Sequence, residues 1–216
     1  MITRVKICGI RSQKDLDYAA SFGADAVGFI VGVTHMSEDA LSIDAARRLA
    51  QATPPFINRV LVTHLTESAA IVDLAQQIAA DTIQVHGLVD EETLRQVRNA
   101  WPGVIIRAVH VDGPESIELA QRAASWSDGI LLDSRAADRL GGTGLVHDWA
   151  ISAEIVRALG STPCLLAGGL SSDNVKQAIE LVKPFAVDLN SGVEDCAGDK
   201  DPLALLQFFE QVLAAR

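Results

Sequence analysis

The feature of this sequence that most restricts its fold is a regular alternation of short apolar runs with longer stretches of helical periodicity. Short apolar runs bounded by polar residues or glycine are typical of strands that are buried on both faces. We expect strands at Arg4–Ile7, Ala26–Val31, Asn58–Val62, Thr82–Val85, Val104–Val109, Gly129–Leu132, Cys164–Ala167 and Phe185–Leu189. Each run is followed by a stretch in which apolar residues recur at helical spacing. We expect helices at Ser12–Phe22, Ile43–Ala52, Glu67–Ala79, Glu91–Asn99, Pro114–Ala124, Ala150–Leu159, Asn174–Leu181 and Pro202–Ala214.

Strands that alternate with helices predict a parallel sheet, because parallel neighbours need a crossover connection. Eight strand-then-helix units in 216 residues give an average pitch of about 27 residues. This predicts an α/β fold, a single (β/α)8 TIM barrel domain over residues 1–216, at the lower end of the usual ~200–250 residues. The alternative is a doubly wound sheet, which we disfavour because no domain break is visible and no GxGxxG follows the first strand.

Composition limits the possible partners and compartment. The formal net charge of −10, with no clustered Lys and Arg, argues against nucleic acid as a partner. The start, MITRVKICGI, lacks the apolar core of a secretory signal, and no run approaches the ~20 apolar residues of a membrane span. We expect a soluble cytoplasmic protein. The three cysteines, Cys8, Cys164 and Cys196, are widely spaced and indicate neither a disulfide framework nor a zinc site.

In a barrel the carboxyl ends of all the strands face one mouth, where ligands bind. Asp133 lies at such an end, directly after the apolar run Ile130-Leu131-Leu132. Three consecutive units end in glycine-containing loops, at Gly141–Gly144, Ala167–Leu170 and Asn190–Val193. Glycines let backbone N–H groups approach an anion closely, and a short helix beginning after Ser191-Gly192 would direct its positive end to the same place. The three loops together predict a substrate that carries a phosphate.

On the other side of the mouth, Cys8 ends the first strand, two residues after Lys6. A thiol acts as a base only as the thiolate, which nearby positive charge favours. Lys6 alternates with Ile7 and is therefore expected inside the barrel, beside Cys8. A pair formed by Cys8 and Asp133 predicts proton transfer between a base and an acid, without a cofactor.

Several motifs along the chain closely resemble those of the phosphoribosylanthranilate isomerase family. They are KICGI at 6–10, DAVGF at 25–29, QVHG at 84–87, LLDS at 131–134, GGTG at 141–144, LAGGL at 166–170, NV at 174–175, VDLNSGVE at 187–194 and KD at 200–201. The resemblance runs nearly from end to end. It implies a (β/α)8 barrel that takes part in tryptophan biosynthesis.

The resemblance also implies a reaction and its residues. The reaction is an Amadori rearrangement, in which an N-(5′-phosphoribosyl) aminoaldose becomes a 1-deoxyribulose 5-phosphate aminoketose. Asp133 would be the general acid and Cys8 the general base, and His86 matches a family position at the mouth, where Lys6 is also expected to contact substrate. The family's phosphate loops correspond to Gly142, Thr143, Gly168, Gly169, Ser191 and Gly192.

The second loop departs from the family pattern. The family usually carries Ser-Pro-Arg there, and its arginine suits the anthranilate carboxylate. This chain reads VTHMSEDALS at 33–42, which places Glu38 and Asp39 at the Pro and Arg positions. Either Arg135 or Arg11 supplies the cation instead, with Arg135 the first choice, or the substrate is another phosphorylated aminosugar that lacks this carboxylate.

Two further alternatives remain open. A metal-dependent sugar-phosphate epimerase is suggested by His35, His64, His86 and His110, which lie near strand ends. The spacing of these histidines matches no metal motif, so no metal is predicted. A ligand-binding protein without activity is the other alternative, and the presence of both Cys8 and Asp133 argues against it. The sequence does not predict an oligomeric state.

Overall fold

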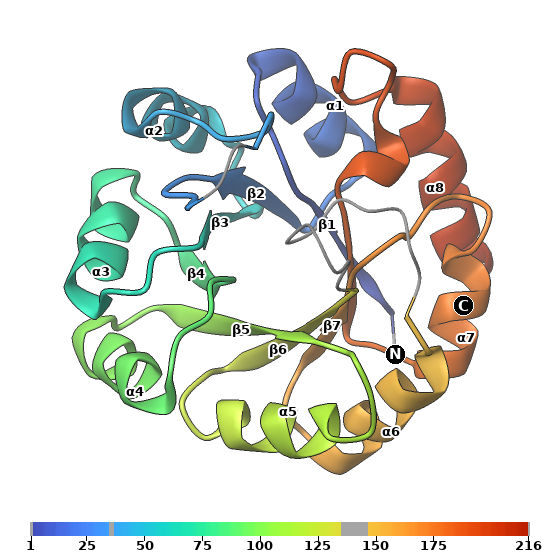
Figure 1. Cartoon of the computed structure of the whole chain (residues 1–216). Coiled ribbons are helices and arrows are strands. Elements are labelled where there is room, and N and C mark those ends of the chain that lie inside the picture. Colours follow the sequence, from blue (N-terminus) through green and yellow to red (C-terminus); the bar gives the residue numbers. More distant parts are fainter. Residues whose placement is uncertain (1, 35–36, 135–146, 216) are drawn as a thin grey trace.

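The computed structural model describes residues 2–34, 37–134 and 147–215. Within them, eight parallel strands form a closed barrel in the order β1 to β8, with β8 paired to β1. Helices surround this barrel on the outside (Figure 1). The predicted (β/α)8 barrel is therefore confirmed.

All eight predicted strands form, and no strand end differs from its prediction by more than one residue. They are β1 Arg4–Ile7, β2 Ala26–Ile30, β3 Asn58–Thr63, β4 Thr82–Val85, β5 Val104–His110, β6 Gly129–Asp133, β7 Cys164–Leu166 and β8 Ala186–Leu189. The β5–β6 ladder reaches the pair His110 and Asp133, so both polar residues belong to strands rather than to the loops after them.

The eight predicted helices also form. They are α1 Gln13–Phe22, α2 Ile43–Ala52, α3 Ser68–Gln77, α4 Glu91–Ala100, α5 Ser116–Ala124, α6 Trp149–Leu159, α7 Val175–Val182 and α8 Pro202–Ala214. Helix α3 ends two residues before the predicted Ala79, because Ala79 takes a left-handed conformation with φ 57°. The short helix predicted near Ser191 is a 3₁₀ turn, η1 Ser191–Val193.

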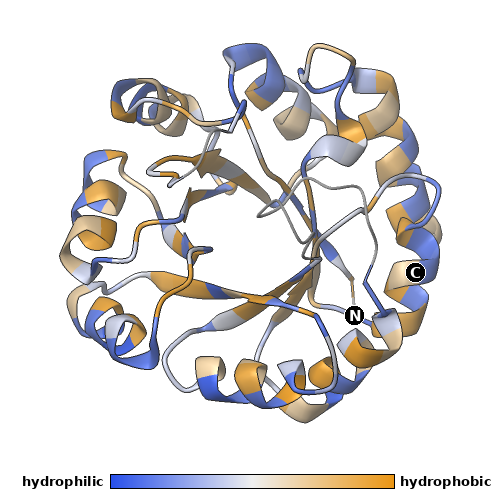
Figure 2. Cartoon of the chain, in the orientation of Figure 1, coloured by the Kyte–Doolittle hydropathy of each residue, from blue (hydrophilic) through white to orange (hydrophobic). Residues whose placement is uncertain are grey.

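The main core lies between the barrel and the helices. Alternate strand residues such as Val5, Ile7, Ile83 and Val85 point outward and are buried against the helices. Figure 2 shows hydrophobic residues on the helix faces that meet the strands and hydrophilic residues on the outer faces. The intervening strand residues fill the barrel interior, which places polar side chains such as Lys6 in the same interior row as Cys8.

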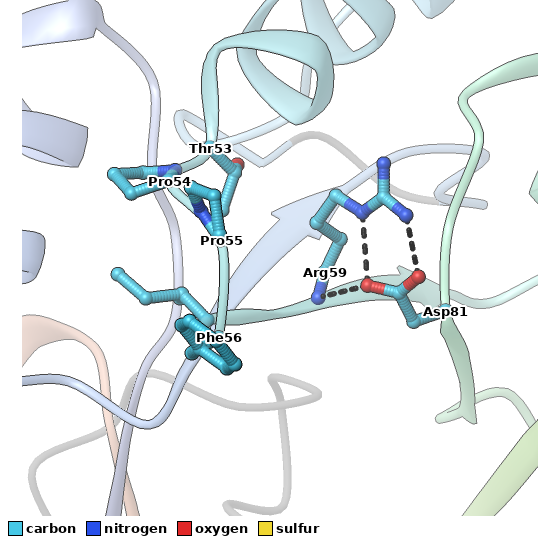
Figure 3. Close-up of a pocket in the computed structure, with 7 residues that line it drawn as sticks. Thr53, Pro54, Pro55, Phe56, Arg59 and Asp81 are labelled. Carbon is cyan, nitrogen blue, oxygen red and sulfur yellow. Dashed lines mark hydrogen bonds and ion pairs between the residues drawn. The ribbon is translucent and has the colours of Figure 1, made fainter.

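The two ends of the barrel differ in chemistry. A surface pocket lies where the chain enters β3 and β4, lined by Thr53, Pro54, Pro55, Phe56, Ile57, Arg59 and Asp81 (Figure 3). Arg59 pairs with Asp81 at its edge. This is the amino end of the strands, whereas the predicted site residues follow the carboxyl ends.

Candidate active site

A buried ion pair between two adjacent strands lies in the barrel interior, next to Cys8. The Lys6 Nζ atom donates hydrogen bonds of 2.8 and 2.7 Å to the two carboxylate oxygens of Asp188. Lys6 and Asp188 are opposite each other in the β1–β8 ladder, which explains the contact. Burial alone would lower the Lys6 pKa, but the charge and hydrogen bonds of Asp188 together with those of Cys8 outweigh burial and raise this pKa, so Lys6 carries a proton at neutral pH.

Cys8 lies directly after β1 and is 7% exposed. Burial raises the pKa of its thiol, and the neighbouring Lys6 ammonium opposes that rise. Gly28 of β2 provides the space for both side chains. A Cβ atom at position 28 would lie 2.9 Å from the Cys8 Sγ atom and 3.2 Å from the Lys6 Cε atom.

Asp133 ends β6 and is 7% exposed. Its Oδ2 atom lies 3.3 Å from Nε2 of His86, and its Oδ1 atom accepts a 2.8 Å hydrogen bond from the Ser134 N–H. Burial alone would raise the Asp133 pKa, but His86 and the Ser134 N–H outweigh it and hold this pKa below its ordinary value. Asp133 is therefore a carboxylate in the structure without substrate.

The loops after β7 and β8 are packed against this acid and against each other. Gly168 has φ 81°, a conformation that side chains rarely adopt, and a Cβ atom there would lie 2.8 Å from the Asp133 Oδ1 atom. A Cβ atom at Gly192 would lie only 1.9 Å from the Leu170 carbonyl oxygen. Ser191 is exposed and begins η1, while Gly168, Gly169 and Gly192 are partly exposed. The predicted phosphate residues of these two loops thus share one end of the barrel with Asp133.

Other predicted residues lie outside the described part of the chain. They are Arg135, Gly142, Thr143 and His35. The residues on either side of 135–146 are described. Ser134 Oγ lies 2.9 Å from His147 Nδ1, and His147 Nε2 lies 2.6 Å from Ser152 Oγ, so both flanks are attached to the start of α6.

Asp39, at the position where the family carries arginine, forms a hydrogen bond and an ion pair with neighbouring loops. Asp39 accepts a 2.7 Å hydrogen bond from Asn190 Nδ2 and lies 3.8 Å from Arg11 Nε. Arg11 Nη2 donates to Asp199 and to the Ala197 carbonyl at 3.0 and 3.1 Å. Arg11, one of the two candidate cations, is therefore already engaged by carboxylates.

Three of the predicted histidines, His64, His86 and His110, lie in a row. The ring of His86 lies 5.1 Å from that of His64 and 5.6 Å from that of His110, measured between centroids. Among residues 2–34, 37–134 and 147–215, no group of three or more His, Cys, Asp or Glu side chains is placed to hold a metal ion. No described helix has the length and apolar character that crossing a bilayer requires.

Sequence reasoning assigned no role to Asp188, Gln84 or Lys200, which are all buried at this site. Lys200 Nζ donates to Asn190 Oδ1 at 2.7 Å and to Glu194 Oε1 at 2.6 Å, and so anchors the loop after β8. A signal for Asp188 was present, because closure of the barrel pairs the last strand with the first and brings a lone strand carboxylate opposite Lys6.

Three comparisons with known proteins agree. The model of the N-(5′-phosphoribosyl)anthranilate (PRA) isomerase family matches residues 5–211. N-(5′-phosphoribosyl)anthranilate isomerase 2 of Methanosarcina mazei is 38% identical over 208 residues, covering 95% of this chain and 92% of that protein. The crystal structure of phosphoribosyl anthranilate isomerase from Thermotoga maritima superposes with a TM-score of 0.87 at 33% identity, covering 98% of this chain and 99% of that one.

A related structure contains a ligand. It is phosphoribosyl anthranilate isomerase in complex with reduced 1-(o-carboxyphenylamino)-1-deoxyribulose 5-phosphate, with a TM-score of 0.84 and 33% identity. The match covers 98% of this chain and 99% of that one.

Proposed function

Because this chain belongs to the N-(5′-phosphoribosyl)anthranilate isomerase family, we propose that Cys8 and Asp133 carry out the two proton transfers of its reaction. The protein is an isomerase of tryptophan biosynthesis. It converts N-(5′-phosphoribosyl)anthranilate, an aminoaldose, into an aminoketose, the 1-deoxyribulose 5-phosphate derivative, by an Amadori rearrangement.

Asp133 protonates the furanose ring oxygen, so that the ring opens and a Schiff base forms. Cys8, as the thiolate, then removes the proton from C2′ of the sugar. The resulting enolamine tautomerises to the ketone. Each step moves a proton, so one acid and one base on opposite sides of the substrate are sufficient.

The observation that carries this assignment is the common location of the acid, the base and two glycine loops. Cys8 follows β1 and Asp133 ends β6, and both strands open at the same end of the closed barrel. Gly168 of the loop after β7 lies against Asp133. A phosphate held by Gly168, Gly169, Ser191 and Gly192 therefore places the attached sugar next to the acid, with Gly142 and Thr143 of the preceding loop as further ligands.

The roles of Lys6 and His86 follow from their contacts. Lys6 is held by Asp188 beside Cys8, so its positive charge favours formation of the Cys8 thiolate, which then accepts the substrate proton. His86 is on the side of Asp133, where it contacts the sugar end of the substrate.

For the anthranilate carboxylate, Arg135 is the better candidate than Arg11, because Arg11 is held by Asp199 and faces Asp39. In Arg135→Ala we expect KM for N-(5′-phosphoribosyl)anthranilate to rise at least ~10-fold, since a charged hydrogen bond contributes ~1.5–3 kcal/mol. Arg11→Ala is the matched variant. A larger rise in KM for Arg11→Ala than for Arg135→Ala would reverse the assignment.

The central test is substitution of the acid and the base. Cys8→Ala and Asp133→Asn are each expected to lower kcat by at least ~10²-fold, the lower range of general acid or base catalysis. Turnover is followed by the loss of substrate fluorescence, and binding of a product analogue should survive in both variants. Cys196→Ala, which changes an exposed thiol, serves as the control. Turnover near the parent rate in either active-site variant would remove that residue from the mechanism.

The setting of the enzyme is also part of the proposal. The net charge of −10 supports a protein without a nucleic-acid partner. We also propose that the enzyme works in the cytoplasm.

A further inference from the structure

The proposed role of Asp133 as the general acid, on which the inference below rests, leaves open where its proton comes from. A general acid must carry a proton when substrate arrives, yet the hydrogen bond from His86 stabilises Asp133 as a carboxylate. The proton must therefore come from a neighbouring group, and His86 is in direct contact with the Asp133 Oδ2 atom, at 3.3 Å.

Behind His86 lies Gln84, two residues earlier along the chain and on the same side of the barrel wall. Gln84 is 1% exposed, and its Nε2 atom lies 3.2 Å from Nδ1 of His86. Gln84, His86 and Asp133 thus form a continuous row from the barrel interior to the mouth. Each ring nitrogen of His86 has one partner in this row.

The backbone around His86 is held from outside the barrel. Arg107 of β5 donates 2.8 Å hydrogen bonds to the carbonyl oxygens of Val85 and Gly87, the two residues that flank His86. The His86 N–H donates to the Thr63 carbonyl oxygen at 2.9 Å. Because the main chain is fixed in this way, the side chains of Gln84 and His86 are the parts that respond to a change in protonation.

Only one end of the Gln84 side-chain amide has a hydrogen-bond partner among the described residues. Its NH₂ group faces His86 Nδ1, while its buried Oε1 atom has no hydrogen-bond partner within the described residues. With the amide N–H at Nδ1, that ring nitrogen acts as the acceptor, which leaves Nε2 as the nitrogen that donates to Asp133. A half-turn of the amide would place Oε1 at Nδ1 without breaking any described bond of that oxygen.

We propose that Gln84 is a positioning residue that, by a half-turn of its amide, lets His86 accept a second proton and deliver the first to Asp133. With Oε1 facing Nδ1, His86 binds a solvent proton at Nδ1 and becomes an imidazolium. Its Nε2 proton then moves to the Asp133 carboxylate. The products are neutral His86, with its proton on Nδ1, and a protonated Asp133. The net result is that one proton is taken up from solvent and Asp133 gains one proton.

Other charged and titratable groups also act on His86 and its partner. His64 of the loop after β3 and His110 of β5 flank the His86 ring, and Asp188 of β8 is close enough to influence its charge. Lys6 neutralises Asp188. Gln84 is uncharged, so its replacement by Met tests hydrogen bonding without changing a charge.

The test compares Gln84→Met, which has no acceptor oxygen, with Gln84→Glu, which keeps an oxygen at the position of Oε1. The pH at which His86 is half-protonated, measured by NMR of ¹⁵N-labelled histidine, should fall in Gln84→Met and rise in Gln84→Glu. We expect kcat to fall at least ~10-fold in Gln84→Met with little change in KM, and Gln84→Glu to recover most of that loss. The limb of the pH profile of kcat/KM that coincides with the His86 midpoint should move in the same directions.

Thr82→Val is the matched control, because it removes a buried hydroxyl from the same strand without touching His86. Thermal melts identify any variant that fails to fold. An unchanged His86 midpoint in both Gln84 variants, or equal losses of kcat in both, would overturn the proposal. The NMR titration requires no turnover, so it separates this outcome from a failure of the Asp133 assignment, which is detected by activity in Asp133→Asn.

Discussion

At the level of single residues, Cys8 is subject to opposing influences on its thiolate. Burial and the negative charge of Asp188 disfavour the thiolate, and the Lys6 ammonium favours it. Burial is the largest of these effects, so the Cys8 pKa lies above its ordinary value. Cys8, the proposed base, is therefore mostly a thiol at neutral pH, and activity should increase with pH as the thiolate forms.

Alkylation measures the balance between thiol and thiolate at Cys8 directly. In a Cys196→Ser background, the rate of Cys8 modification by iodoacetamide should rise with pH, with a midpoint above the ~8.5 of a free thiol. Asp188→Asn removes a negative charge but keeps an acceptor for Lys6, so the midpoint should move to lower pH. Cys164 is buried within β7, which raises its pKa to about 12, and should not react. A midpoint that stays constant in Asp188→Asn would contradict the electrostatic explanation.

The residues that sequence reasoning found and missed at this site differ in a physical way. Cys8, Asp133 and Gly168 were predicted because each follows or ends a strand, a position that periodicity reveals. Asp188 and Gln84 lie within strands and not at their carboxyl ends, so the rule that places site residues after strands does not identify them. Their contacts, of Asp188 with Lys6 on the adjacent strand and of Gln84 with His86, appear only in the structure.

At the level of elements, the start of α1 is joined to the segment before α8 by one carboxylate. Asp15 is fully buried, and its Oδ2 atom accepts hydrogen bonds from the backbone N–H groups of Arg11 and Ser12, at 3.1 and 3.0 Å. Its other oxygen accepts from the Lys200 N–H at 3.0 Å. Ser12 completes a capping box by accepting from the Asp15 N–H.

Removal of this carboxylate should therefore destabilise the protein. We expect Asp15→Ala to lower the free energy of unfolding by about 2–4 kcal/mol, because it leaves buried N–H groups without an acceptor. Urea unfolding followed by circular dichroism measures the change. Asp17→Ala, an exposed position on the same helix, should change stability by less than ~0.5 kcal/mol. Equal effects of the two substitutions would show that the buried contacts contribute little.

At the level of the whole molecule, the order of elements was predictable and the spatial neighbours of the loops were not. Eight repeated units sufficed to predict the barrel, because a parallel sheet of this connectivity has few other ways to bury all its strands. The contact between Asp39 and Asn190 joins residues 151 positions apart, and no local pattern indicates it. That the chain is a single domain stays a prediction.

Closure of the barrel depends on its last strand. The β1–β8 ladder contains the pairs Arg4 with Ala186, Val5 with Val187, Lys6 with Asp188 and Ile7 with Leu189. A chain that ends at residue 184 would leave β1 and β7 with open edges and Lys6 without its counter-ion. We expect this truncation to lose cooperative thermal unfolding, whereas a chain that ends at residue 214 should melt like the full chain. A sharp transition in the shorter chain would show that the barrel does not need closure.

The close approach of Gly192 to Leu170 determines how this end of the barrel can evolve. Any side chain at position 192 would displace the Leu170 carbonyl, and the loop that carries Leu170 begins at Gly168, against Asp133. If these loops bind the phosphate as proposed, a change that repositions it would thus also disturb Asp133, the proposed acid. New substrates with a differently placed phosphate are therefore accessible only through coordinated changes in both loops, which makes the spacing between phosphate and reacting carbon a slowly changing property of the enzyme.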